Sequence, residues 1–246
     1  MKKTKFLILI LLLVVSCFQM NNDEFTVGNL WKITSINGTE SYIFGTIHLY
    51  PKGELELSEK VLLKLKKCNI LALERDVTNK SEQKKFMDFE MPKFFTESYQ
   101  VVITEYGNEL VGMENQLIEV ARDQGIKITG LESTEEILHI MIDLNQIEIP
   151  QTHFEKDKML QVYRQSLEMY KREQIKIFKD SLYEQIPKRI TELTVDQRNV
   201  NWFGNIVNLI EKEPTFIAVG MGHLGGRSGL LNLLAQKGYK LNRVKI

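Results

Sequence analysis

The chain has 246 residues, 43% of them hydrophobic and 26% charged, and its 32 lysines and arginines equal its 32 aspartates and glutamates in number. This length is enough for one substantial domain or two small ones. The formal net charge of zero and the lack of a long basic block in the sequence argue against nucleic acid as the main partner.

The first 17 residues predict a signal peptide. Three lysines, at positions 2, 3 and 5, precede the apolar stretch Phe6–Val15, which has about half the length that a membrane-spanning helix needs. The end of the segment, Val14-Val15-Ser16-Cys17, resembles a bacterial lipobox, which predicts cleavage before Cys17 and lipid attachment to its sulfur. We therefore expect a protein lipid-anchored to a bacterial membrane, in the cell envelope and facing outside the cytoplasm, with residues 18–28 as a tether. Ordinary secretory cleavage, with Cys17 incidental, is the alternative.

The rest of the chain, residues 29–246, predicts a single domain, because no proline-, serine- or glycine-rich linker divides it. Past Cys17 the sequence has only Cys68, so no internal disulfide can form. Cys68 begins an apolar run, and we expect a buried, unreactive thiol there, with a nucleophilic thiol as the alternative.

The first half of the domain predicts a hairpin, two further strands and three helical segments. Asn37-Gly38 lies between two apolar runs and is a strong signal of a two-residue hairpin turn. Ser58 is expected to cap a helix, and Pro92 to interrupt another. The predicted strands are 30–36, 41–44, 69–73 and 126–131, and the predicted helices are 59–67, 83–95 and 117–124.

The second half predicts more helix than strand. Ser133-Thr134-Glu135-Glu136 has the composition of a helix N-terminus, and apolar residues recur at helical spacing from about 154 to 183. Strands and helices alternate along the chain, so the predicted fold class is α/β: a central mixed β-sheet flanked by helices, with an N-terminal β-hairpin and a long helical insertion. The remaining predicted elements are the helices 195–210 and 228–236 and the strands 215–219 and 239–244.

An apolar run ends twice in the pattern Gly-x-x-His. Gly45-Thr46-Ile47-His48 follows the second strand of the hairpin, and Gly220-Met221-Gly222-His223 follows the strand 215–219. We expect each glycine to allow a sharp turn that brings the histidine to the rim of the sheet, where α/β proteins build sites. A single histidine there would more often satisfy a hydrogen bond at a strand end. The repetition favours a functional site.

Glu74 and Glu132 also follow short predicted strands, so we expect them at the same rim. A lone glutamate at a strand end more often caps a helix or faces solvent, but four strand ends carrying His, Glu, Glu and His indicate a common site. Imidazole and carboxylate ligands together suit zinc, manganese, cobalt or iron. A glutamate that is not a ligand can act as general base toward a bound water. The pattern therefore predicts metal-assisted hydrolysis.

The chain resembles the TraB/GumN family over nearly all of residues 29–246. Relatives of that family include the Tiki metalloproteases, and it is more distantly similar to erythromycin esterases and a haem-binding lipoprotein group. The resemblance implies that His48, Glu74 and His223 hold a divalent metal ion such as manganese, cobalt or zinc. It is carried by Leu30-Trp31-Lys32-Ile33, Gly45-Thr46-Ile47-His48-Leu49, Leu73-Glu74, Gly130-Leu131-Glu132-Ser133, Arg198-Asn199 with Trp202, and Ala218-Val219-Gly220-Met221-Gly222-His223-Leu224.

Three further residues complete the predicted site. Glu132 is expected to be a fourth ligand or the base that activates water. Arg198 is expected to hold a substrate carboxylate or stabilise an oxyanion, with a salt bridge between helix and sheet as the alternative. Asn199 would cap or position it.

The predicted function is a membrane-anchored metal-dependent hydrolase, in first place a metallopeptidase acting on a peptide or a small exported substrate. A non-catalytic lipoprotein that binds a metal, haem or a signalling peptide is the alternative. A third possibility is a structural envelope protein whose histidines only brace loops.

Overall fold

The computed structural model describes residues 25–150 and 155–246. The predicted signal peptide, Cys17 and the tether up to residue 24 lie outside the described residues, so their assignment stays a prediction. Within the described ranges, no helix has the length and apolar character that crossing a membrane requires.

The central feature is a six-stranded mixed sheet with the strand order β6-β4-β7-β2-β1-β8. Strands β6, β4, β7 and β2 run parallel to one another, and β1 is antiparallel to both β2 and β8. The predicted α/β class with a mixed sheet is confirmed. The strands are β1 Leu30–Thr34, β2 Glu40–Thr46, β4 Ile70–Arg75, β6 Lys127–Glu132, β7 Thr215–Gly220 and β8 Lys240–Arg243.

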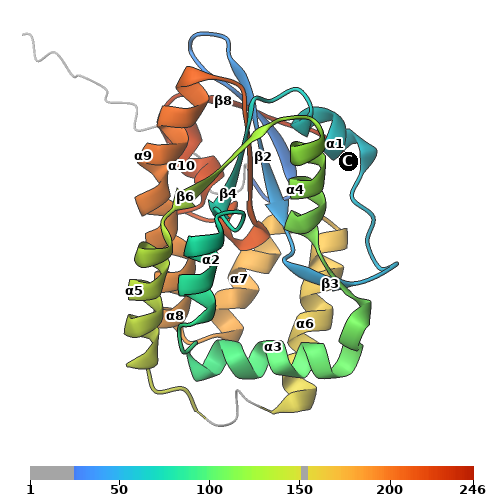
Figure 1. The fold of residues 1–246 in the computed structure, drawn as a ribbon, viewed down its shortest axis with the longest axis vertical. Coiled ribbons are helices and arrows are strands. Elements are labelled where there is room, and N and C mark those ends of the chain that lie inside the picture. Colours follow the sequence, from blue (N-terminus) through green and yellow to red (C-terminus); the bar gives the residue numbers. More distant parts are fainter. Residues whose placement is uncertain (1–24, 151–154) are drawn as a thin grey trace, which may run out of the picture.

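The apolar runs of β2, β4 and β7 explain their central place. Such strands bury both faces, as parallel strands covered by helices do. Figure 1 shows α9 and α10 beside one part of the sheet, α1 and α4 beside another, and the other helices beyond the carboxyl ends of the parallel strands. The helices are α1 Glu59–Leu65, α2 Lys80–Met87, α3 Lys93–Tyr106, α4 Met113–Asp123, α5 Thr134–Asn145, α6 Lys156–Lys171, α7 Ile175–Gln185, α8 Lys188–Thr191, α9 Gln197–Lys212 and α10 Leu230–Gln236.

The apolar core has two parts. The larger one surrounds the sheet and includes Trp202 and Phe216, neither of which is exposed. The smaller one joins α5 and α8 through Ile137, Ile140 and Ile190, and partly buried aromatic residues around α2 and α3 pack against it. The helices beyond the strand ends therefore have packing of their own, which fixes them opposite the edge of the sheet.

The hairpin is confirmed, but its turn is longer than predicted. The amide of Ser35 donates to the carbonyl of Thr39, which leaves the three residues Ile36, Asn37 and Gly38 in the loop. Gly38 has a φ of 82°, as a three-residue loop with a left-handed last position requires.

The predicted helical region from about 154 to 183 is confirmed, and it is divided into two helices, α6 and α7. They are separated at Glu173, whose φ of 53° is left-handed. No glycine or proline marks the turn. Tertiary contacts hold it: the Glu173 carbonyl accepts from Gly28 N at 2.8 Å and its carboxylate accepts from Asn29 N at 3.0 Å.

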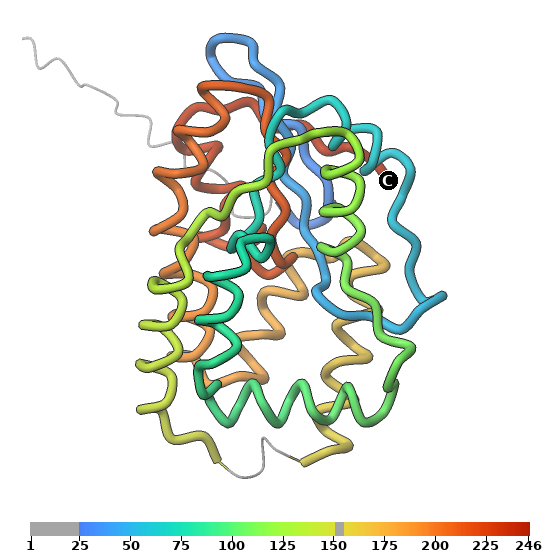
Figure 2. The backbone as a smooth tube through the Cα atoms, viewed as in Figure 1, coloured from blue at the N-terminus to red at the C-terminus, as the bar shows by residue number. Residues whose placement is uncertain are grey.

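The segment between β4 and α4 also differs from the prediction. The predicted helical pattern over 83–95 is interrupted, since α2 ends at Met87 and α3 begins at Lys93, directly after Pro92. The helix α3 continues to Tyr106, well past the predicted end at residue 95. Figure 2 shows the chain descending from the sheet as α2, crossing as α3 and returning upward to α4. Two short strands that the sequence did not predict, β3 Leu49–Pro51 and β5 Leu110–Gly112, pair antiparallel beside this path.

Candidate active site at the carboxyl edge of the sheet

The fold brings the four predicted strand-end residues to one edge. His48 lies just beyond β2 and His223 just beyond β7, while Glu74 and Glu132 lie at the ends of β4 and β6. Those strands are neighbours in the order β2-β7-β4-β6. Because parallel strands present their carboxyl ends on the same side, residues far apart in the sequence become adjacent.

The closest approach joins His48, Glu74 and His223. Oε1 of Glu74 lies 3.8 Å from Nε2 of His48 and 3.6 Å from Nε2 of His223. The same space borders Gly220: a Cβ atom there would lie 3.3 Å from His48 Nε2, 3.4 Å from Glu74 Oε1 and 3.7 Å from His223 Cδ2. The three predicted metal ligands thus face one small volume in front of Gly220.

His223 is held in one orientation and in its neutral form. Its Nδ1 lies 2.7 Å from Asn199 Oδ1, while Asn199 Nδ2 donates to the carbonyls of His223 and Ser228 at 3.1 and 2.9 Å. The amide orientation makes Oδ1 the acceptor, so the ring proton is on Nδ1 and Nε2 keeps its lone pair. Burial lowers the pKa of His223 to about 3, and its ring lies over Trp202 with centroids 4.6 Å apart.

The side chain of Asn199 therefore contacts His223. The sequence suggested instead that Asn199 would position Arg198.

His48 is oriented by a residue that the sequence did not indicate. Its Nδ1 lies 2.8 Å from Oε1 of Glu114, and Thr46 Oγ1 donates to the same oxygen at 2.6 Å. Burial lowers the pKa of His48, but the carboxylates of Glu114 and Glu74 outweigh burial and raise it to about 9. Glu114 is in the first turn of α4 and carries no motif, so only the packing of α4 on the sheet reveals it.

Arg198 joins the two strand-end glutamates. Its Nη2 donates to Glu74 Oε2 at 2.7 Å and to Glu132 Oε1, and its guanidinium lies 4.5 Å from the ring centre of Trp202. Glu74 Oε1 also accepts from Gly220 N at 2.8 Å. Burial opposes ionisation of Glu74, but Arg198 first and then the histidines hold its pKa far below the usual range. Glu74 is therefore a carboxylate at neutral pH.

Glu132 lies behind Arg198. Its side chain is 4% exposed, and Trp202 Nε1 donates to its second oxygen at 2.9 Å. Burial raises the pKa of Glu132, although Arg198 opposes that effect. The role of Glu132 as ligand or base stays a prediction, and its contacts favour an effect exerted through Arg198.

A π-helical segment, Glu192–Asp196, leads into α9 just before Arg198. Such segments shift the phase of a helix and are frequent at functional sites. After it, the neighbours Arg198 and Asn199 and, one turn further along, Trp202 are buried on the side of α9 that faces the sheet. Arg198 and Asn199 therefore reach the ends of three strands, β4, β6 and β7.

The glycines of the two Gly-x-x-His motifs do not make the sharp turns that the sequence suggested. Gly45 lies inside β2, and Gly220 has a φ of −53°, which any residue can adopt. Neighbouring atoms instead leave little room for a side chain at either glycine. A Cβ on Gly45 would lie 2.7 Å from Leu224 Cδ1 and 3.1 Å from the backbone of Met221.

Within residues 25–150 and 155–246, no three His, Cys, Asp or Glu side chains are already spaced as a metal-binding group. The donor chemistry nevertheless fits an ion. Two Nε2 atoms and one carboxylate oxygen face each other, and each Nδ1 contacts a neighbouring oxygen, which is the usual arrangement of metal-binding histidines. His48, Glu74 and His223 are the residues that would hold it.

Gly220→Ala tests whether the space in front of Gly220 is used. The added methyl would fill the volume between His48 Nε2 and Glu74 Oε1 without backbone strain. We expect metal retention by the protein to fall by at least about tenfold while its melting temperature changes little. Elemental analysis and a thermal melt check this, with Gly204→Ala as control because a Cβ at Gly204 meets nothing within 4 Å. Unchanged metal retention in Gly220→Ala would contradict the placement.

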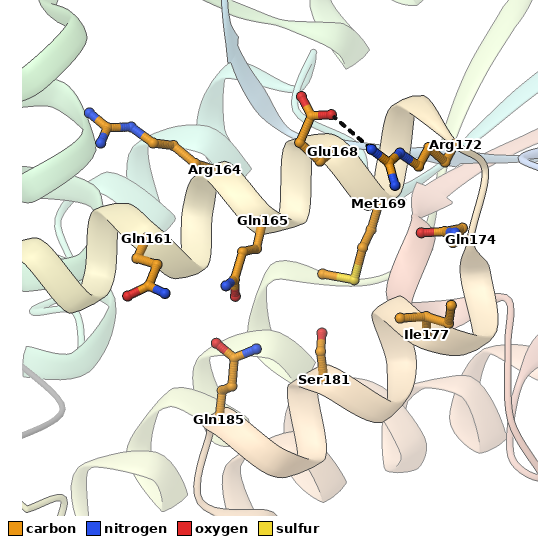
Figure 3. Close-up of a pocket in the computed structure, with 10 residues that line it drawn as sticks. All are labelled: Gln161, Arg164, Gln165, Glu168, Met169, Arg172, Gln174, Ile177, Ser181 and Gln185. Atoms are coloured by element: carbon orange, nitrogen blue, oxygen red, sulfur yellow. Dashed lines mark ion pairs between the residues drawn. The ribbon is translucent and has the colours of Figure 1, made fainter.

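A separate hollow of about 550 Å³ lies between α6 and α7 (Figure 3). Most of the residues that line it are polar or charged, among them Gln161, Gln165 and Ser181. On α6, Gln161 and Gln165 lie on the side opposite Leu167 and Tyr170, which belong to the larger core. None of the strand-end residues lines this hollow, and the site described above is the one that the sequence motifs mark.

The fold and the site define an α/β protein with histidine and glutamate side chains grouped at the carboxyl edge of its parallel strands. The chain belongs to the TraB/PrgY/gumN family, whose model matches residues 29–105 and 95–243. The predicted family is thereby confirmed. No curated protein and no solved structure matches the chain.

Proposed function

We propose that this member of the family is a divalent-metal-dependent hydrolase, in first place a peptidase, anchored to the outside of a bacterial membrane through Cys17. One observation carries the proposal: Nε2 of His48 and Nε2 of His223 converge on Oε1 of Glu74. Manganese, cobalt and zinc suit this donor set. Polarisation of a scissile carbonyl and a lowered pKa of the attacking water are the chemistry that a bound ion supplies.

The chain's own residues prepare the site for that chemistry. Asn199 and Trp202 hold His223 as a neutral ring with Nε2 free, and Arg198 keeps Glu74 ionised. Glu114 fixes the direction of His48. The positive charge of Arg198, whose side chain is 11% exposed, also favours a substrate group that gains negative charge.

One observation favours a second candidate, a lipoprotein that binds a metal, haem or a peptide without cleaving it. Glu132, the predicted base, is almost fully buried, and both of its oxygens accept hydrogen bonds. A peptide library incubated with the protein and each metal separates the two candidates. Products that form with metal and disappear with a chelator identify a hydrolase, while retention of ligand without products identifies a binder.

Glu114→Gln is expected to weaken metal binding by roughly 10–100-fold, the usual effect of losing the partner of a metal-binding histidine. The substitution keeps the shape of the side chain but removes the charge that contacts His48 Nδ1. Calorimetric titration with manganese or zinc measures the change. Glu119→Gln, at an exposed position of the same helix, is the matched control. Equal metal affinity in both variants would exclude Glu114 as the residue that positions His48.

A further inference from the structure

The loop that follows His223, residues 225–229, has few side chains that could hold it in place. Three of its five residues are glycines, and Gly226 has a left-handed φ of 84°. Glycine loses more conformational freedom on folding than any other residue, so a loop of this composition depends on contacts from outside to keep one shape. The loop connects the histidine to α10.

Helix α7 supplies such contacts. A Cβ atom on Gly225 would lie 3.1 Å from Ile175 O, so the backbone of the loop runs close to that of the helix. A Cβ atom on Gly226 would lie 3.4 Å from Lys179 Cγ, so the loop also lies against the stem of this lysine. The Lys179 side chain is only 4% exposed, although it ends in an ammonium group.

The ammonium group of Lys179 has a partner that also holds the loop. Its Nζ donates to Asp196 Oδ1 at 2.7 Å, and Ser228 Oγ donates to the same oxygen. Asp196 is the last residue of the π-helical segment before α9. One carboxylate oxygen therefore joins α7, the start of α9 and the loop. Because desolvation offsets most of the attraction in a buried ion pair, the geometry that this contact fixes explains it better than added stability does.

Ser228 continues the network toward His223. Its carbonyl accepts from Asn199 Nδ2 at 2.9 Å, and Asn199 Oδ1 lies 2.7 Å from His223 Nδ1. An amide side chain has a donor end and an acceptor end. Because the carbonyls of Ser228 and His223 hold the donor end, the amide presents its oxygen to the ring. If the Ser228 carbonyl moved away, the amide could turn over, and the ring would carry its proton on Nε2, the nitrogen that faces Glu74.

We propose that the lysine, aspartate and serine of this network are positioning residues for the site. They keep the ring proton of His223 on Nδ1 and leave Nε2 free, acting through the Ser228 carbonyl and Asn199. The position of the ring proton is a property of the protein without metal, whereas binding of an ion by the free Nε2 rests on the proposed function.

The position of the ring proton is measured by NMR in the full-length protein, labelled with isotope-enriched histidine and kept in EDTA. A long-range hydrogen–nitrogen spectrum distinguishes the two neutral forms of the ring, and a His223→Gln sample assigns the signals. We expect the wild-type ring to carry its proton on Nδ1. In Lys179→Met and Ser228→Ala the ratio of the Nδ1-protonated to the Nε2-protonated form should fall by roughly threefold to tenfold, the effect of one weakened hydrogen bond. Ser228→Thr retains the hydroxyl and should keep the wild-type ratio.

Lys176→Met is the matched control. Lys176 is on the same helix and forms an ion pair with Asp180 at the same distance of 2.7 Å, but its side chain is 41% exposed. Its loss should leave the ratio unchanged. A proton on Nε2 in the wild-type protein, or ratios in Lys179→Met and Ser228→Ala equal to that in Lys176→Met, would overturn the proposal. Ser228→Ala leaves the ion pair intact and supplies the test if Lys179→Met fails to fold.

Calorimetric titration with zinc separates this proposal from the proposed function. A zinc affinity that falls in the same variants that shift the ring proton would support both. A shifted ring proton in these variants, with no zinc bound even by the wild-type protein, would support the network and contradict the metal site. Zinc binding by the wild-type protein, with no shift of the proton in any variant, would do the reverse.

Discussion

Replacing Arg198 by methionine is expected to lower the free energy of unfolding by roughly 3–5 kcal/mol, because it leaves two largely buried carboxylates without their partner. Arg198 is the shared donor to Glu74 and Glu132, whose side chains are 16% and 4% exposed. Urea unfolding followed by circular dichroism measures the change.

The matched control for this prediction is Arg164→Met. Arg164 forms an ion pair with Glu105 at 2.8 Å, but its side chain is 57% exposed, and exposed pairs contribute about 0–1 kcal/mol. The double variant Arg198→Met with Glu132→Gln should recover part of the loss, since it removes one of the two unpaired charges. If Arg198→Met costs no more than Arg164→Met, the buried network does not stabilise this edge of the sheet.

Alanine at His48 or at His223 is expected to reduce hydrolysis by at least about 100-fold. Loss of a residue that only orients a metal ligand costs roughly 10–100-fold, so loss of the ligand itself should cost more. The two variants should also give similar losses, because both Nε2 atoms face the same carboxylate oxygen. Rates of cleavage of the best peptide from the library, measured at saturating metal, provide the test.

His139→Ala is the control for this pair. His139 is on the exposed side of α5 and outside the site, so its loss should leave the rate unchanged. Full activity of either His48→Ala or His223→Ala would show that the paired motifs serve the fold and not the reaction.

The parts of the fold that could be predicted follow from local patterns. Alternating apolar strands and helices gave the α/β class, and the buried runs before each Gly-x-x-His gave the central strands β2 and β7. The turn at Glu173 could not be predicted, because the groups that hold its left-handed backbone, Gly28 and Asn29, come from the other end of the chain. The break at Pro92 could be predicted, but the sequence did not indicate that a helix follows it as far as Tyr106.

The candidate site also has residues that the sequence indicated and contacts that it could not indicate. Motif and strand position marked His48, Glu74 and His223, and the structure places them around one space. Glu114 has no distinguishing sequence context, since an acidic residue in the first turn of a helix is ordinary. The contact of Asn199 with His223 and that of Glu132 with Trp202 depend on how α9 packs against the sheet, which spacing along the chain does not encode.

The most direct test of the central claim is the metal content of the purified full-length protein after incubation with manganese, cobalt and zinc and removal of free ions. Elemental analysis compares it with the His223→Ala and His139→Ala variants. We predict about one ion per chain in the wild-type protein and in His139→Ala, and none in His223→Ala. Equal metal content in all three proteins, or no retained ion in any of them, would contradict a metal site formed by His48, Glu74 and His223.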